Sequence, residues 1–374
     1  MPYSQEMKID PAHFGTAYGA GELALLEQIR QQAAQATARR RNPCLTLGIG
    51  DDCALLTPGR NEELAVTTDL SIAGRHFRLD WHPPEAVGHR ALARGLSDLA
   101  AMGARPVAAF LSLGLPPALT LAPGRRRAGA ALPSWMKGFL GGLLALAQAH
   151  STPLAGGDLA ESALAVADIV LLGAIPRGRA LLRSGAHPGD LLYVTGTLGG
   201  AAAGLALLEE LASAHSGRAC PPRIPKRLAS HLAPHLYPQP RISQGLWLQR
   251  HGLASAALDL SDGLSTDLAH LCEESGVAAE VDADGLPLHP AATLEQALHG
   301  GEDYELLFTA PAAARLPRRI AGVPVTPIGR IRKPRRGQPA VTLISAEGSH
   351  PLPARGWQHF SGDRNRPCLP ASRS

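Results

Sequence analysis

The sequence has few cysteines and none of the cysteine spacings that hold zinc or redox disulfides. Five cysteines are spread over 374 residues, and no two of them form a CxxC pair. A zinc knuckle and a thioredoxin-like motif are therefore not indicated. An odd number of scattered cysteines in a chain of this length is typical of a reducing compartment.

Long apolar runs are also missing. The most apolar stretch, residues 140–149, is interrupted by Gly141, Gly142 and Gln148, whereas a membrane-spanning helix needs about 20 apolar residues. Residues 1–20 lack a basic segment followed by an apolar one, so they do not indicate a signal peptide. The sequence therefore predicts a cytoplasmic protein that does not bind a membrane.

A strong excess of one charge is absent, because the formal net charge is only +4. Much of this surplus comes from arginine-rich runs at residues 125–127 and 332–336, which lie among prolines and glycines. Such runs are typical of solvated loops. We therefore do not expect nucleic acid to be a partner.

Two signatures of nucleotide-using enzymes are missing as well. The chain has neither a GxxxxGK[ST] phosphate loop nor the HRD/DFG motifs of protein kinases. Glycine-rich stretches at residues 48–50, 156–157 and 196–200 could offer backbone amides to phosphate, but each taken alone is better explained as a structural turn. A nucleotide-using enzyme with this sequence must employ another fold.

The apolar periodicity predicts strands and helices mixed through two comparable halves, an α/β (α+β) chain. A helix is expected between Pro83-Pro84 and Gly103, because proline opens helices and glycine closes them. Another is expected over residues 134–150, with Ser134 as its N-cap. We expect a flexible extension (1–20), an N-terminal domain (21–177), a C-terminal domain (178–360) and a disordered tail (361–374).

Carboxylates recur beside glycines or at the expected ends of strands. The residues concerned are Asp51-Asp52, Asp69, Asp158, Asp259, Asp262, Glu302 and Asp303. A single such aspartate usually caps a helix, closes a turn or forms a salt bridge. The recurrence, with few basic residues beside these positions, points instead to a shared site.

Asp98 is the most informative of the carboxylates. Within its expected helix, Ala91, Gly95 and Met102 lie on the same face as Asp98 by their spacing. An unpaired carboxylate on such a face costs several kcal/mol unless it is paired or bound to a metal. Gly95, one turn earlier, is expected to leave space for a group to approach.

Clustered carboxylates repel one another and so favour a bound divalent cation. Oxygen ligands without histidine or cysteine pairs favour Mg²⁺ over Zn²⁺. Mg²⁺ held by carboxylates commonly also binds substrate phosphates. The residues therefore predict magnesium-assisted phosphate chemistry.

Eight stretches, in order, resemble the thiamine-monophosphate kinase family, which belongs to the superfamily of aminoimidazole ribonucleotide synthetase and selenophosphate synthetase. They are GIGDDCALL (48–56), TTDLSIAGRHF (67–77), ALARGLSDLAAMGARP (91–106), LAGGD (154–158), GRALLRSGAHPGDLLYVTGTLG (178–199), LDLSDGLSTDLAHL (258–271), GGEDYELLFT (300–309) and PIGRI (327–331). Together they span nearly all of residues 21–360.

The resemblance implies a two-domain fold like that of aminoimidazole ribonucleotide synthetase, with a mixed β-sheet packed by helices in each domain. It implies a homodimer formed through the N-terminal sheets. It also implies ATP as co-substrate and several Mg²⁺ ions. The expected reaction is direct in-line transfer of phosphate from ATP to thiamine monophosphate, which gives thiamine diphosphate and requires no general base from the protein.

The resemblance assigns roles position by position. The metal positions are Asp52, Thr67, Thr68, Asp69, Asp98, Asp158, Asp259 and Asp262. The nucleotide positions are Gly157, Asp158, Arg183 and Ser261. The positions near thiamine phosphate are His76, Glu302 and Trp357, although His76 is equally compatible with a core or surface histidine and Trp357 with a hydrophobic plug.

The chain departs from the family at three points. The family usually has Asn where Gly95 stands, Thr-Thr where Leu159-Ala160 stand, and Asp where Gly200 stands. The segment 116–133 also looks longer than usual and is expected to be a surface loop or insertion.

Two rival functions stay open at this point. A sister enzyme that activates an amide or selenide is one, but the chain lacks a lysine between Lys8 and Lys137 and offers only Cys53 as a reactive thiol. A nucleotide-binding scaffold without activity is the other. The acidic residues that this chain retains argue against a scaffold. A copy without activity would keep its hydrophobic core but would have no need of unpaired buried carboxylates.

Overall fold

The computed structural model describes residues 22–38, 42–49, 53–120, 133–214 and 220–357. The helices are α1 (Glu22–Ala38), α2 (Pro84–Ala101), α3 (Pro117–Thr120), α4 (Ser134–Ala149), α5 (Gly200–Ala214), the 3₁₀ helix η2 (Lys226–Leu228), α6 (Ala229–Leu236), α7 (Ile242–His251), α8 (Leu264–Ser275) and α9 (Leu294–His299). The strands are β1 (Leu45–Leu47), β2 (Leu55–Leu56), β3 (Glu62–Ile72), β4 (Arg105–Leu115), β5 (Leu154–Glu161), β6 (Val166–Pro176), β7 (Leu191–Thr195), β8 (Ala256–Asp259), β9 (Ala278–Asp282), β10 (Leu306–Ala310), β11 (Arg319–Ile320), β12 (Val323–Arg332), β13 (Val341–Ser345) and β14 (Gly348–Pro351).

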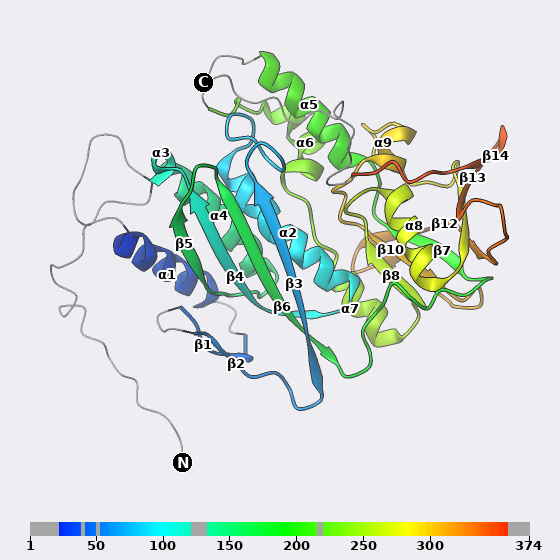
Figure 1. Ribbon diagram of the computed structural model, residues 1–374, viewed down its shortest axis with the longest axis horizontal. Helices are drawn as coiled ribbons and strands as arrows, with labels where there is room; N and C mark the ends of the chain where they lie inside the picture. Colours follow the sequence, from blue (N-terminus) through cyan, green and yellow to red (C-terminus); the bar gives the residue numbers. More distant parts are fainter. Residues whose placement is uncertain (1–21, 39–41, 50–52, 121–132, 215–219, 358–374) are drawn as a thin grey trace.

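Two mixed sheets lie toward opposite ends of the molecule, as Figure 1 shows. The first has the strand order β3-β6-β4-β5, in which only β4 and β5 pair in parallel. The second has the order β14-β13-β9-β12-β7-β10-β8, with β11 paired to β12 and with β13 and β9 parallel. These sheets and their covering helices confirm the expected fold class.

Helix α2 crosses between the two halves and is buried on almost every side. A Cβ at Gly142 of α4 would lie 1.9 Å from the carbonyl oxygen of Glu85 on α2. A Cβ at Gly245 of α7 would lie 1.9 Å from the carbonyl oxygen of Ala100, also on α2. Only glycine permits these backbone approaches, so α2 is held closely by one helix from each half of the sequence.

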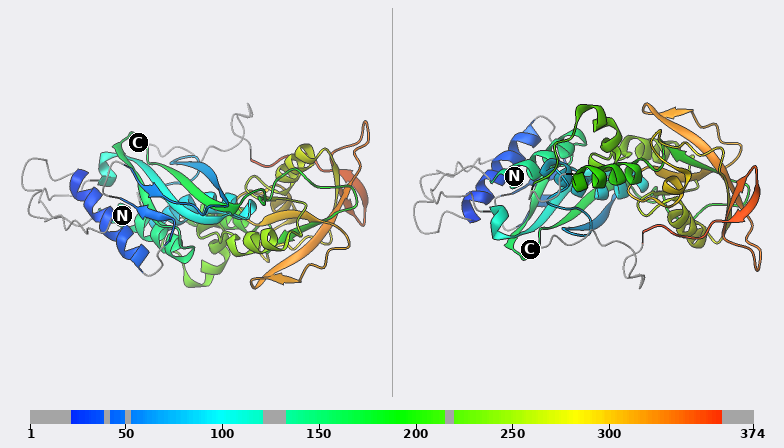
Figure 2. Two further views of the ribbon diagram at one scale, coloured as in Figure 1. Left: turned by 90° about the horizontal axis from the view of Figure 1, so that it is seen from below. Right: turned by 90° about the horizontal axis from the view of Figure 1, so that it is seen from above.

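The hydrophobic core continues across the expected boundary at residue 178. One buried cluster joins Leu96 and Leu171 of the first half with Ile242 and Phe308 of the second. A smaller cluster packs Trp81 beside Leu232 of α6. The elongated views in Figure 2 show the sheets arranged along one body. The domain limits stay a prediction, but the two halves share one hydrophobic core.

Several local expectations need correction. Asp69 and Asp158 do not end their strands, because β3 pairs with β6 as far as Ile72 and β5 continues to Glu161. Ser134 is not an N-cap: α4 begins at this residue, Pro133 precedes it, and no side chain caps the helix.

The strands β1, β2, β9, β11 and β14 and the helix α9 are short elements that the sequence did not predict. Residues 116–133 contain the short helix α3, and 121–132 lie outside the described residues, as do 1–20 and 361–374. No helix in the described part of the chain is long and apolar enough to cross a bilayer.

Candidate active site

A cleft with a volume of about 480 Å³ opens where the first sheet, α2 and the second half of the chain meet. It is lined by β3 and the loop after it, by the start of α5 and by the loops that precede α8 and β10. Six of the expected site residues line it, namely Asp69, His76, Ser261, Asp262, Glu302 and Trp357. These residues are spread over almost 290 positions of sequence, so the fold alone brings them together.

Successive side chains of β3 point to opposite faces of the sheet, and this alternation decides which of them face α2. Thr67 and Asp69 are partly buried on the inner face, while Thr68 is exposed on the other face. The Thr67 hydroxyl donates a short hydrogen bond to Asp98 Oδ2 on α2. Asp69 and Asp98 therefore lie on the inner side with Thr67, and the side chain of Thr68 is not part of this group.

The carboxylate of Asp69 is only partly satisfied. Its Oδ1 lies 3.5 Å from Nε of Arg94. Its Oδ2 is buried and has no hydrogen-bond partner among the described atoms. An orphaned, buried carboxylate oxygen is costly, which makes this atom a natural ligand for a cation.

Asp259 and Asp262 reach the same region from the second half. The Ser97 hydroxyl of α2 donates to Asp259 Oδ2 at 2.6 Å. The loop that carries Asp262 is shaped by Asp267, whose Oδ2 accepts the amide hydrogens of residues 261, 262 and 263 at 3.0 Å each. Asp267 was not singled out from the sequence, although its place in the first turn of α8, just after Ser261-Asp262-Gly263, was a usable signal.

The acidic residues raise one another's pKa values. Burial, and then the charges of Asp98 and Asp168, raise the pKa of Asp69 to about 6, although Arg94 opposes this. Burial also raises the pKa of Asp98. Burial and the neighbouring Asp98 raise the pKa of Asp259 well above its ordinary value. A cation would relieve this repulsion.

The donor set fits Mg²⁺, since it consists of carboxylates and hydroxyls. Within the described residues, no three acidic, histidine or cysteine side chains already converge on one point. Instead, Thr67 and Ser97 each hold one carboxylate. The fit of these residues to Mg²⁺ therefore rests on the chemistry of the donors and on the unpaired oxygen of Asp69. Asp52, another expected metal ligand, lies outside the described residues.

The remaining expected nucleotide residues lie elsewhere. Gly157 and Asp158 are exposed on β5, at the opposite edge of the sheet from β3. They line a second hollow of about 400 Å³ together with residues of α1 and β4. Arg183 is exposed on the loop before β7, but its charge lowers the pKa of Asp98, which places it near that carboxylate. Within one chain, Gly157 and Asp158 thus line a different hollow from Ser261, and Arg183 lines neither.

Basic residues are closer to the carboxylates than the sequence suggested. Arg90, Arg94 and Asp98 follow one another at intervals of four along α2, so they form one stripe. Arg94 lines the cleft beside Asp69, and Arg90 forms an ion pair with Glu302 at 2.7 Å. The i, i+4, i+8 spacing was the signal that could have revealed both arginines.

Gly95 does not leave space for a ligand, contrary to the expectation. A Cβ at this position would lie 2.2 Å from Cδ1 of Leu171 and 3.5 Å from Cγ2 of Thr67. Leu171 of β6 is fully buried. The absent side chain therefore lets the sheet pack closely on α2.

The backbone beside the cleft is unusual. Glu302 has φ +66° and Tyr304 has φ +51°, which are left-handed values for non-glycine residues. Such conformations are rare and often occur at functional sites. Between them, Asp303 accepts the amide hydrogens of Gly199 at 2.6 Å and Ala201 at 3.0 Å, so it caps the start of α5.

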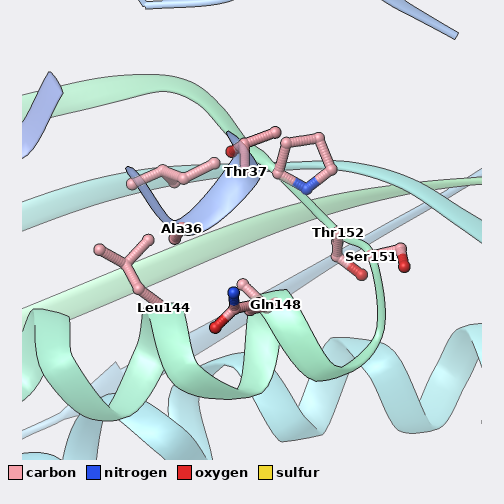
Figure 3. Close-up of a pocket in the computed structure, with 9 residues that line it drawn as sticks. Ala36, Thr37, Leu144, Gln148, Ser151 and Thr152 are labelled. Atoms are coloured by element: carbon pink, nitrogen blue, oxygen red, sulfur yellow. The ribbon is translucent and has the colours of Figure 1, made fainter. Parts of the chain in front are cut away.

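A further hollow lies away from this region, between α1 and the end of α4 (Figure 3). It is lined by Thr37, Leu144, Gln148 and Thr152, among others, and its volume of about 10 Å³ holds about one water molecule. It is too small for a substrate, so the large cleft is the candidate active site.

Comparison with known proteins supports a single family over most of the chain. Residues 50–178 match the model of the AIR synthase related protein N-terminal domain, and residues 187–341 match the model of its C-terminal domain. The thiamine-monophosphate kinase of Salmonella typhimurium is 42% identical over 296 residues, which are 76% of this chain and 83% of that protein.

Solved structures agree with these sequence matches. The crystal structure of thiamine-monophosphate kinase from Stenotrophomonas maltophilia K279a superposes with a TM-score of 0.69 at 37% identity, covering 87% of this chain and 97% of that one. A structure described as AaThiL complexed with AMPPCP and TMP gives a TM-score of 0.66 at 30% identity, with 92% and 100% covered.

Proposed function

Because the chain belongs to the thiamine-monophosphate kinase family, we propose that it transfers the γ-phosphate of ATP directly onto the phosphate of thiamine monophosphate. The product is thiamine diphosphate. The observation that carries this proposal is the single cleft that unites Asp69 and Asp262 with His76, Glu302 and Trp357. The similarity to a structure described with AMPPCP and TMP supports the same pair of substrates. The proposed place of action is the cytoplasm.

The acceptor requires little activation by the protein. A phosphate monoester has a second pKa of about 6, so it is largely dianionic at neutral pH. The barrier lies instead in bringing two anions together in line. We therefore assign no general base to this chain.

Mg²⁺ is the cation that this donor set would hold. The proposed ligands are the metal positions that the family resemblance implies, Asp52, Thr67, Asp69, Asp98, Asp158, Asp259 and Asp262; Thr68, the eighth such position, turns its side chain away from Asp69 and Asp98. When bound, Mg²⁺ would offset the charge of the phosphates and orient them. The protein's part is to keep these carboxylates close despite their repulsion, which Thr67 and Ser97 do by hydrogen bonding.

Arg94 adds a fixed positive charge to the cleft. Burial lowers its pKa, but the neighbouring Tyr304 and the charges of Asp69, Glu302 and Asp98 raise it by more, so the guanidinium stays charged in the cleft. Arg183, with Gly157, Asp158 and Ser261, is proposed to bind the nucleotide.

His76 and Trp357 are proposed to contact thiamine monophosphate. The amide of Ile72 donates to Nδ1 of His76 at 3.0 Å, so the neutral ring carries its proton on Nε2 and can donate from there. The amide of Trp357 donates to the carbonyl of Asp262 at 2.9 Å, which holds the indole at the cleft. Its ring can attract the cationic thiazolium.

A homodimer through the N-terminal sheets is part of this proposal. The outer face of β3 exposes Leu64, Val66 and Leu70, with Val66 61% exposed. Such apolar patches commonly mark protein interfaces.

The test is a kinase assay that compares thiamine monophosphate with thiamine, using ATP and Mg²⁺. Phosphorus NMR should show a diphosphate ester and ADP only with the monophosphate. ATP binding without turnover on thiamine monophosphate would instead support a scaffold, and turnover on free thiamine would refute the proposed acceptor.

A further inference from the structure

Arg90 occupies the centre of a buried polar cluster between the two halves of the chain. Its side chain is 7% exposed and lies on α2, behind the wall of the cleft. Nη2 donates to both carboxylate oxygens of Glu302, at 2.7 and 2.8 Å, and to the carbonyl of His76 at 3.2 Å. Nη1 donates to the carbonyl of His235 at 2.7 Å. One guanidinium thus joins α2, α6 and the two loops that carry His76 and Glu302.

The two loops need such a fixed point. His76 follows β3, whereas Glu302 follows α9 in the other half, and neither lies in a helix or strand. Glu302 also has the unfavourable φ of +66°, so a strong side-chain interaction is needed to keep it there. Nη2 of Arg90 contacts both oxygens of this carboxylate, and such a charge-assisted pair supplies both energy and direction.

The ring of His235 completes the cluster beside Glu302, with Nδ1 3.7 Å from Oε2 of that carboxylate. Its Nε2 lies 3.0 Å from Nε2 of His82, and its ring nitrogens lie 2.8 and 3.0 Å from Nη1 of Arg90. Both histidines are buried. Arg90 is therefore confined on two sides and cannot easily swing toward the cleft.

We infer that Arg90 is a positioning residue, which holds His76 and Glu302 in the arrangement that binds the phosphorylated substrate. This inference rests on the proposed function. Without Arg90, the Glu302 carboxylate would lose its hydrogen-bonded partner and keep mainly the more distant charge of Arg94, so its negative charge would repel the substrate phosphate. The loss should therefore weaken thiamine monophosphate binding more than it slows transfer.

The experiment compares Arg90→Met, Arg90→Lys and the double variant Arg90→Met/Glu302→Gln with the wild type. Calorimetry measures the Kd of thiamine monophosphate without ATP, and the coupled assay measures KM and kcat. Arg90→Met should raise the Kd and the KM by roughly tenfold or more, with a smaller change in kcat. Arg90→Lys should lie in between, and the double variant should recover part of the Kd.

Arg241→Met is the matched control. Arg241 forms another buried pair, with Nε 2.6 Å from Oε2 of Glu305, and makes no described contact with His76 or Glu302. The variant Arg241→Met should lower the melting temperature, as Arg90→Met does. Its Kd for thiamine monophosphate should stay near the wild-type value.

An unchanged Kd in folded Arg90→Met would overturn the inference, and so would an equal rise in Arg241→Met. If Arg90→Met does not fold, Arg90→Lys decides by the same comparison. A wild-type protein that neither binds nor phosphorylates thiamine monophosphate would overturn the proposed function and this inference with it. Failure of the inference alone leaves wild-type turnover intact.

Discussion

The Ser97 hydroxyl donates a 2.6 Å hydrogen bond to Asp259, across 162 positions of sequence. Ser97 lies on α2 and is fully buried, and Asp259 ends β8 in the other half and is 4% exposed. This bond holds a carboxylate of the second half against the helix that carries Asp98. It is one of the points where the acidic cluster depends on how the two halves pack.

Ser97→Ala should destabilise the protein by about 1–3 kcal/mol, because the buried Asp259 carboxylate loses a donor. Urea unfolding followed by circular dichroism measures the change. Ser243→Ala, at an exposed position of α7, is the control and should shift the free energy of unfolding by less than about 0.5 kcal/mol. Equal effects in the two variants would show that the bond contributes nothing.

Asp69→Asn should reduce phosphate transfer by roughly a hundredfold or more while the fold stays intact. The amide has the shape of the carboxylate but removes the anionic oxygen that has no partner. A coupled ADP assay with added Mg²⁺ and a melting curve provide the two measurements. Asp282→Asn, at the end of β9 in the other sheet, is the control, and wild-type turnover in Asp69→Asn would refute the metal role.

Gly95→Asn, which introduces the usual family residue, should destabilise the protein by about 1–3 kcal/mol. The new side chain collides with Leu171, whose Cδ1 would lie 2.2 Å from the added Cβ. The double variant Gly95→Asn/Leu171→Ala should lose less free energy of unfolding than the two single variants lose in sum. Gly141→Ala, where the added Cβ meets nothing within 4 Å, should be neutral or stabilising. Additive effects at Gly95 and Leu171 would contradict the proposed collision.

The two buried histidines His82 and His235 should lower the stability as the pH drops below about 6.5, a contribution opposite in sign to that of Asp69, whose raised pKa favours the folded state at low pH. Burial and Arg90 lower the pKa of His82 to about 3, and burial lowers the pKa of His235 well below its ordinary value. The unfolded chain therefore takes up protons near pH 6.5 that the folded protein does not accept, and each histidine contributes up to about 1.4 kcal/mol per pH unit below that point. Urea unfolding from pH 7.5 to 4.5 measures the free energy of unfolding at each pH. Relative to the wild type, His82→Gln should become more stable as the pH falls, and parallel curves for the two proteins would exclude the effect.

Val66→Glu should convert a dimer into monomers, since it places a charge in the exposed apolar face of β3. Sedimentation velocity measures the change. Leu182→Glu is the control, because Leu182 is 49% exposed on a loop outside that face, and it should leave the oligomeric state unchanged. A wild-type monomer, or a dimer that tolerates Val66→Glu, would contradict an interface at this face.

The sequence by itself determined which residue types and motifs are present, and these were enough to predict the family and the mixed sheets. The order of the motifs, matched to that of the family, also led to Asp69, Asp262, His76 and Glu302 before their positions in space were known. Local spacing sufficed for α2, because the proline, the glycine and the apolar stripe all lie within one helix.

Only the tertiary structure decided how these residues meet. The alternation of β3 separates Thr68 from Thr67, and the strand order places Asp158 at the far edge from Asp69. Leu171 fills the space beside Gly95, and Arg90 binds Glu302, which lies 212 positions away. Such contacts join residues distant in the chain, so they depend on packing between elements and not on the local propensities that a sequence pattern records.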